Sequence, residues 1–305
     1  MNTDASSLDL NTLLQQAIQL FENGSYSQSE AAFQQLHQAK SSFLSTLYLA
    51  QLAQLRQEGA YWINPLEEAL TQHRDSADGY YILGHSYQQN RQLPQAAQAF
   101  YLALNWRLQN QLIDPVGATP SQHKPQQHTL SAEALPLLLK TLTGLKQVGL
   151  HAFPTAGTLL GLERTGQLLP NDKDVDIGID WSQMGAAINH LTAEGWQEEG
   201  ASYGMINPRC FRHPSSLVLD LCGYATEQTT GETISGLWMP DIPFDWNRIT
   251  RFPAIQLIRK QSAFGVIWYP RQPEQLLEAL YGTDWQTPDA HFDTIVCAPN
   301  LLKDS

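Results

Sequence analysis

The stretch GTLLGLERTGQLLPNDKDVDIGID, Gly157 to Asp180, decides the fold of the C-terminal half of the chain. It places a Gly-Thr pair and an arginine before aspartates at positions 172, 174, 176 and 180. In an extended strand, alternate side chains share a face, so Asp174 and Asp176 are neighbours on one side. The hydrophobic residues between them then point into a core, and Asp180 lies past the acid pair.

A third acid lies outside this stretch, in SLVLDLCGY, residues 216–224. Asp220 alternates with leucines and therefore projects from the opposite face of its strand. If the two strands are neighbours, Asp174, Asp176 and Asp220 form a cluster that suits one or two divalent ions, because close carboxylates repel each other and Mg²⁺ prefers oxygen ligands. The alternative is a solvated acidic face.

The order of the predicted elements gives the acids a context. A strand runs into Ala156-Gly157-Thr158, a helix continues to Arg164, and the two acidic strands follow. This order resembles the plan of the nucleotidyltransferase fold, in which a glycine and a small residue let backbone N–H groups and a hydroxyl approach phosphate at a helix N-terminus. A turn followed by a helix N-cap is the simpler interpretation of a Gly-Thr pair alone.

The same stretch resembles the signature of the LicD/fukutin family, which combines GT-LLG, an arginine, and a proline before an acidic cluster that ends in D-x-D-I. The matching positions are Gly157, Thr158, Leu160, Gly161, Arg164, Pro170, Asp172, Asp174 and Asp176. LLEALYGTDWQTPDAHFD, residues 276–293 and here called the tail segment, resembles the end of the family's domain. The resemblance spans about residues 133–293.

The resemblance implies a metal-dependent phosphotransferase that moves a phosphocholine or polyol-phosphate group from a CDP-activated donor to a glycan or related hydroxyl acceptor. Asp174 and Asp176 would bind Mg²⁺ or Mn²⁺, and Asp220 would be a third ligand or the general base. The residues implied to contact donor phosphate are Gly157, Thr158 and Arg164. A structural salt bridge of Arg164 with Asp172 is an equal alternative.

Two departures from the LicD pattern leave the donor alcohol open. Asn171 follows Pro170 where an aromatic residue is common, and Lys173 interrupts the acids, which is closer to fukutin. The middle section, residues 181–258, resembles no family and is expected to set the choice of acceptor. Two other functions stay open: a nucleotidyltransferase that transfers NMP to a small molecule or protein, and an inactive transferase-fold scaffold that works through its repeats.

The N-terminal part, residues 9–112, is rich in Ala, Gln and Leu and contains a repeat. Small residues recur after 33 and 34 positions at Ala17, Ala50 and Gly84. The last copy resembles the tetratricopeptide pattern and predicts two antiparallel helices in close contact. Three helical hairpins with a concave surface for a protein partner are expected; an irregular helical bundle is the alternative.

Residues 113–130 carry three prolines and many polar residues and are interpreted as a linker. Residues 131–305 alternate between helical and strand patterns. The chain is therefore predicted to be an α+β protein of two domains, the first made of tetratricopeptide-like helical repeats and the second an α/β nucleotidyltransferase-like domain with a mixed sheet.

Composition limits the choice of partners. The net charge of -12 disfavours a nucleic-acid or membrane surface, and no window has the roughly 18 apolar residues of a spanning helix. The three cysteines lack CxxC spacing, which favours a packing role and a reduced, cytoplasmic location.

Two further groups have ordinary explanations besides functional ones. Arg209, Arg212 and His213 could approach substrate phosphates but also suit an ordinary loop. In the tail segment, Tyr281 and Trp285 are expected to be mostly architectural, docking the end of the chain.

Overall fold

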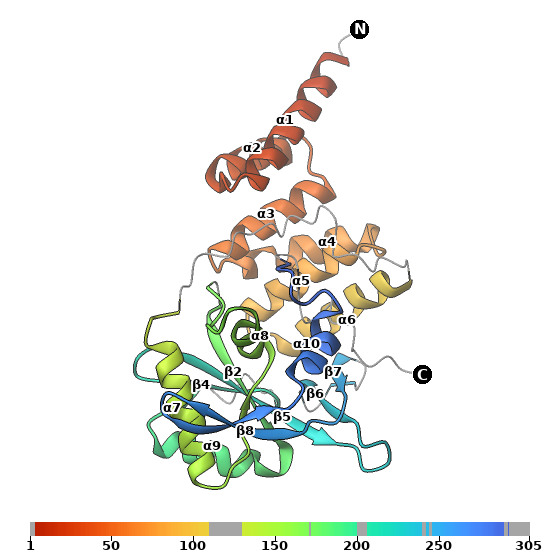
Figure 1. The fold of residues 1–305 in the computed structure, drawn as a ribbon. Helices are drawn as coiled ribbons and strands as arrows, with labels where there is room; N and C mark the ends of the chain where they lie inside the picture. Colours follow the sequence, from red (N-terminus) through yellow and green to blue (C-terminus); the bar gives the residue numbers. More distant parts are fainter. Residues whose placement is uncertain are drawn as a thin grey trace. The chain divides into compact units, whose positions relative to one another are not determined.

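A computed structural model describes residues 4–109, 130–170, 172–199, 206–239, 242–243, 246–289 and 292. The chain divides into two compact units, one within residues 1–124 and the other within residues 125–305, and each is described by itself (Figure 1). Apart from Leu130, the predicted linker lies outside the described residues, as does Cys297. The predicted domain limits stay predictions.

The described part of the N-terminal unit is entirely helical, which confirms the all-α prediction (Figure 1). Its helices follow one another in three pairs, and a short 3-10 helix, η1 (Gly59–Trp62), enters the second pair. The helices are α1 (Asp4–Glu22), α2 (Tyr26–Ala39), α3 (Phe43–Leu55), α4 (Ile63–Gln72), α5 (Ala77–Gln89) and α6 (Leu93–Gln109). Their assignment as tetratricopeptide-like repeats stays a prediction.

Small residues allow the helices of this unit to pack closely. Ala17 and Ala50 are fully buried, and Gly84 is buried between α5 and α6. A Cβ atom at Gly84 would lie 2.6 Å from the ring of Phe100. The ring therefore occupies the space that a side chain at this position would need, and the glycine sets the contact between the two helices.

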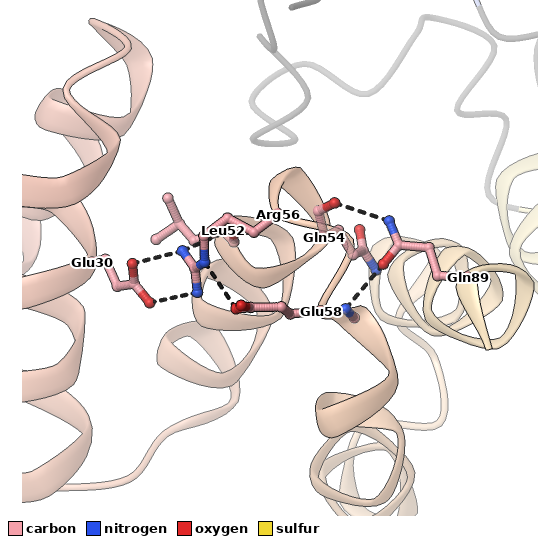
Figure 2. Close-up of polar contacts among 7 residues, drawn as sticks. Glu30, Leu52, Gln54, Arg56, Glu58 and Gln89 are labelled. Carbon is pink, nitrogen blue, oxygen red and sulfur yellow. Dashed lines mark hydrogen bonds and ion pairs between the residues drawn. The ribbon is translucent and has the colours of Figure 1, made fainter.

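Polar side chains link one helix pair to the next (Figure 2). Arg56, after α3, donates to both carboxylate oxygens of Glu30 on α2 at 2.8 and 3.0 Å and to Glu58 at 2.8 Å. Gln89 on α5 accepts from the backbone N–H of Gly59 at 2.9 Å and donates to the carbonyl of Gln54 at 2.9 Å. Because the Arg56 side chain is 45% exposed, its ion pairs orient the helices more than they stabilise them.

The C-terminal unit is built on a mixed sheet with the strand order β1-β2-β5-β4-β3. β2 and β5 pair in parallel, and the other neighbours, including the extension from β5 through β6 to β7, are antiparallel. The strands are β1 (Phe153–Pro154), β2 (Asp174–Asp180), β3 (Gln197–Glu198), β4 (Arg209–Arg212), β5 (Val218–Thr226), β6 (Thr233–Leu237) and β7 (Arg248–Phe252). A separate hairpin pairs β8 (Leu257–Ser262) with β9 (Gly265–Pro270).

Helices lie on both sides of this sheet (Figure 1). α7 (Ala134–Gln147) and α9 (Met184–Ala193) lie on one side, and α8 (Ala156–Thr165) and α10 (Pro273–Tyr281) lie on the other. Val175, Ile177 and Ile179 of β2 are fully buried, as the alternating pattern predicted. The combination of a helical unit with a mixed-sheet unit confirms the predicted fold class.

In the part of the chain that the structure describes, every helix is too short or too polar to cross a bilayer.

The contact at Gly84 gives a prediction for the stability of the helical unit. Gly84→Ala should lower the free energy of unfolding by about 1 to 3 kcal/mol, because the clash with Phe100 outweighs the roughly 1 kcal/mol that alanine normally gains over glycine in a helix. Gly185→Ala on α9 is the matched control, since no atom lies within 4 Å of its added Cβ. Thermal unfolding of the full chain measures both; equal midpoints would contradict the packing argument.

Candidate active site

The parallel pairing of β2 with β5 brings the predicted acids onto one face of the sheet. Asp176 lies directly opposite Asp220, and Asp174 lies opposite Val218. Residues opposite each other, and residues two apart on one strand, project from the same face. Asp172, just before β2, belongs to the same group, and the four residues are here called the acid cluster. The predicted cluster required these two strands to be neighbours, and in the structure they are.

The first turn of α8 lies against the acid cluster. The hydroxyl of Thr158 accepts a hydrogen bond from the backbone N–H of Asp176 at 2.7 Å, and the Thr158 N–H lies 3.3 Å from the Asp176 carboxylate. A Cβ atom at Gly157 would lie 2.8 Å from Asp172 Oδ2 and 3.3 Å from Asp176 Oδ2. A side chain here would displace the Asp172 carboxylate, so the glycine lets the positive end of α8 lie directly against the acids.

The turn after α8 returns the chain to β2. Gly166 ends the helix in the left-handed conformation with φ 71°, which glycine adopts without strain. A Cβ at Gly161 would lie 2.6 Å from the carbonyl oxygen of Gln167. The two glycines therefore let the returning chain pack against the helix and deliver Asp172 to the site.

Burial and mutual repulsion raise the pKa of three of the acids. Burial, with help from Asp174, raises the pKa of Asp172 to about 7. Burial and the charges of the other three carboxylates raise the pKa of Asp176 well above its usual value. Burial also raises the pKa of Asp220 to about 6. The cluster thus concentrates negative charge that the protein alone does not neutralise.

The acid cluster has the chemistry of a site for a hard divalent ion, because its donors are carboxylate oxygens and because a cation would relieve their repulsion. Among the described residues, no three or more His, Cys, Asp or Glu side chains already converge on one ion position. Mg²⁺ commonly takes one or two carboxylates and completes its shell with substrate phosphates and water. The residues fit an ion in that manner.

Arg164 contacts the tail segment in place of an acid. Its Nε donates to the carbonyl of Trp285 at 2.8 Å, and its Nη2 donates to the same carbonyl and to that of Thr287 at 3.0 Å. None of the ion pairs found in the described residues joins Arg164 to Asp172 or to another carboxylate. The arginine therefore fastens the end of α8 to the chain that follows α10.

The sequence did not predict that two further residues lie near the acids. Cys210 on β4 lies directly opposite Asp220, and a hydrogen bond from its thiol lowers the pKa of the Asp220 carboxyl against the effect of burial. Tyr281 on α10 is partly buried, and desolvation, followed by the charges of Asp176 and Asp172, raises the pKa of its phenol. The alternation in Arg209–Arg212 could have indicated the position of Cys210, whereas the tail segment marked Tyr281 only as an architectural residue.

The other candidates have structural contacts. Arg209 pairs with Glu198, and Arg212 pairs with Glu199 at 2.5 Å, so both arginines join β4 to the chain at and just after β3. The Nδ1 atom of His213 lies 2.8 Å from the Ser215 hydroxyl. All three side chains therefore have partners at or just after β3 or in the turn that follows β4, which explains their positions without a substrate.

Comparison with known proteins identifies the class of this site. Residues 149–240 match the family model described as LicD/FKTN/FKRP, nucleotidyltransferase domain. For this segment of the chain, the match confirms the resemblance that the motifs predicted. The match contains Gly157, the acid cluster and part of the middle section, and it ends before the tail segment. A transferase activity in the general sense of the family follows.

The remaining comparisons add little. The crystal structure of the lincosamide antibiotic adenylyltransferase LnuA with bound lincomycin is similar over 49% of this chain and 85% of that chain, at 15% identity and a TM-score of 0.35. A likeness at this level carries no argument. No curated protein matches the chain.

The raised pKa values predict how stability changes with pH. An acid whose pKa is higher in the folded than in the unfolded state stabilises the fold below its unfolded pKa, near 4, and loses that contribution as the pH rises through the folded value. Without divalent ions, wild-type protein should therefore lose stability between about pH 4 and pH 7, with Asp172 and Asp220 titrating near 7 and 6.

Thermal unfolding in EDTA at a series of pH values measures this loss. Asp172→Asn should remove part of it, and its midpoint should exceed that of wild type by several degrees at pH 8 but not at pH 4. If the unfolding midpoints of the two proteins change with pH in parallel, the charge of Asp172 does not destabilise the fold.

The contacts of Arg164 predict a structural role. Arg164→Ala should cost about 2 kcal/mol or more, because it leaves the carbonyls of Trp285 and Thr287 without a charged donor. Arg164→Lys should recover only part of this, since lysine lacks the planar fork. The exposed Arg271→Ala is the control. Limited proteolysis should cut the chain after α10 faster in Arg164→Ala, and an unchanged rate would contradict the role.

Proposed function

We propose that the protein is a metal-dependent phosphotransferase that moves a phosphocholine or polyol-phosphate group from a CDP-activated donor to a hydroxyl of a glycan or related acceptor. One observation carries this proposal: Asp176 and Asp220 lie opposite each other beneath the first turn of α8, within the segment that matches the LicD family. The general transferase class comes from that match. The donor, the acceptor and the metal are our inference.

In this proposal the donor diphosphate lies beside the N-terminus of α8 and the acid cluster. Asp174 and Asp176 hold Mg²⁺ or Mn²⁺, which would neutralise the diphosphate and the departing CMP. The backbone near Gly157 supports the phosphates, since no side chain there blocks their approach. Thr158 acts by positioning, because its hydroxyl accepts the N–H of Asp176 and so fixes that residue on β2.

Asp220 is the proposed general base, or else a third metal ligand. Its pKa of about 6 leaves the carboxylate mostly ionised at neutral pH yet more basic than an ordinary aspartate. It would take the proton of the acceptor hydroxyl as that oxygen attacks the β-phosphorus. The bond between the β-phosphorus and the bridging oxygen breaks, and CMP leaves with that oxygen and the electron pair.

We place this activity in the cytoplasm, and we assign the helical unit the task of binding a protein partner or the acceptor machinery. Stacked helix pairs form extended surfaces that commonly bind other proteins.

Release of CMP tests the enzymatic proposal. Purified protein with Mg²⁺ or Mn²⁺ should release CMP from one of CDP-choline, CDP-ribitol or CDP-glycerol in the presence of an acceptor, and EDTA should stop it. Asp176→Asn and Asp220→Asn should each lower the rate at least about 100-fold. Glu274→Gln, an exposed acid on α10, is the control and should keep full activity.

The same assay separates the alternatives. Labelled cytidine found on the acceptor would favour NMP transfer, as the name of the matched domain allows. If no donor releases CMP and Mg²⁺ and Mn²⁺ leave the unfolding temperature unchanged, the enzymatic proposal fails and a scaffold role through the helical unit remains.

A further inference from the structure

A hollow, here called the distal pocket, lies on the sheet face that carries the acid cluster. It has a volume of about 340 Å³ and opens where β2 and β5 end. Its lining includes His151, Phe153, Asp180, Tyr224, Thr226 and Trp268. Because Asp180 lies opposite Tyr224 and Asp176 lies opposite Asp220, both groups project from the same face of the same two strands.

The acid cluster and the distal pocket are separated along β2 by a distance that one substrate molecule can span. Asp180 follows Asp176 by four residues, or roughly 13 Å at about 3.3 Å per residue. Between them, a Cβ atom at Gly178 would lie 2.6 Å from the Phe153 ring and 2.9 Å from the Tyr224 ring. The two rings therefore cover the glycine and line the acid-cluster side of the pocket.

These two rings are held in place by polar and aromatic contacts. The Tyr224 hydroxyl lies 2.5 Å from the hydroxyl of Thr155, the residue that precedes α8. The rings of Phe153 and Tyr224 lie 5.4 Å apart, and His151 meets Trp268 edge to face at 4.9 Å. A pre-formed aromatic wall thus connects the start of α8 with the distal pocket.

The charges at the pocket suit an uncharged ligand. Of the described residues that line it, none is a lysine or arginine, and Asp180 is a carboxylate. Lys146 and Arg259 lie near the pocket, but against the Trp268 ring at 5.8 and 5.7 Å from its centre. A phosphate would meet Asp180 directly, whereas the hydroxyl or amino groups of a neutral ring would find acceptors in Asp180 and Thr226.

We propose that the distal pocket binds the uncharged ring of a substrate, a nucleobase or a sugar, while the phosphate lies at the acid cluster. This rests on the proposed function. Aromatic side chains stack on the faces of either kind of ring, and the volume is within the usual range for small ligands. The donor's base and the acceptor's sugar share this chemistry, and the experiment distinguishes them.

Saturation-transfer NMR on the full chain, without metal or turnover, tests the pocket. The probes are cytidine and a panel of methyl glycosides. One class should bind, and Trp268→Leu should weaken its binding about tenfold or more, while Trp268→Phe should keep most of it. Trp238→Ala, an exposed tryptophan that does not line the pocket, is the matched control.

Asp180→Asn keeps the test decisive if Trp268→Leu fails to fold, because Asp180 is exposed and the exchange keeps its shape. It should weaken the same probe at least threefold. If these variants lose binding of cytidine, the pocket is assigned to the base of the donor. If they lose binding of a glycoside, it is assigned to the sugar of the acceptor.

If neither class binds, or if binding is equal in wild type and in both pocket variants, the proposal is overturned. No turnover is needed, so this outcome is distinct from a failure to release CMP. A protein that binds a ring but releases no CMP would keep the pocket and lose only the proposed reaction.

Discussion

The parallel register of β2 with β5 is the constraint on which the site depends. It places two aspartates opposite each other on one face and puts alternating hydrophobic residues into the core on the other. Hydrophobic burial fixes this register, because a slip by one residue would turn the acids into the core. The unfavourable proximity of the carboxylates is thus imposed by the packing on the reverse side of the same strands.

α8 lies against these acids at one end and binds the tail segment at the other. The helix presents its positive end to the acids, and the absence of a side chain at Gly157 leaves room for the Asp172 carboxylate beside it. At its other end, Arg164 holds the carbonyls of the chain after α10. Two segments separated by more than a hundred residues are joined in this way, and Tyr281 is brought near the acids.

The same sheet face also provides room for a substrate larger than a phosphate. The acids lie toward the start of β2 and the distal pocket lies at its end, with Phe153 and Tyr224 between them. Charge is concentrated at one site and aromatic surface at the other. A face divided in this way suits a reaction whose substrates present a phosphate and a neutral ring.

Local sequence patterns were sufficient to predict the acidic strands, the family resemblance and the helical N-terminal unit. Alternation in residues 174–180 and 217–222 gave the strands and the facing of their acids, and the motif around Gly157 gave the family of residues 149–240. The helical N-terminal unit also followed from periodicity and small residues. In each case the information lies within a few turns or one strand, where burial on one face dictates the sequence.

Only the tertiary structure decided which strands are neighbours and what Arg164, Cys210 and Tyr281 contact. The arginine was expected at a phosphate or an acid, yet its guanidinium donates to backbone carbonyls, which carry no sequence signal. Cys210 meets Asp220 across a strand pair, and the distal pocket gathers residues from distant segments. Such contacts form when elements distant in the sequence pack together. Local spacing and composition therefore give no sign of them.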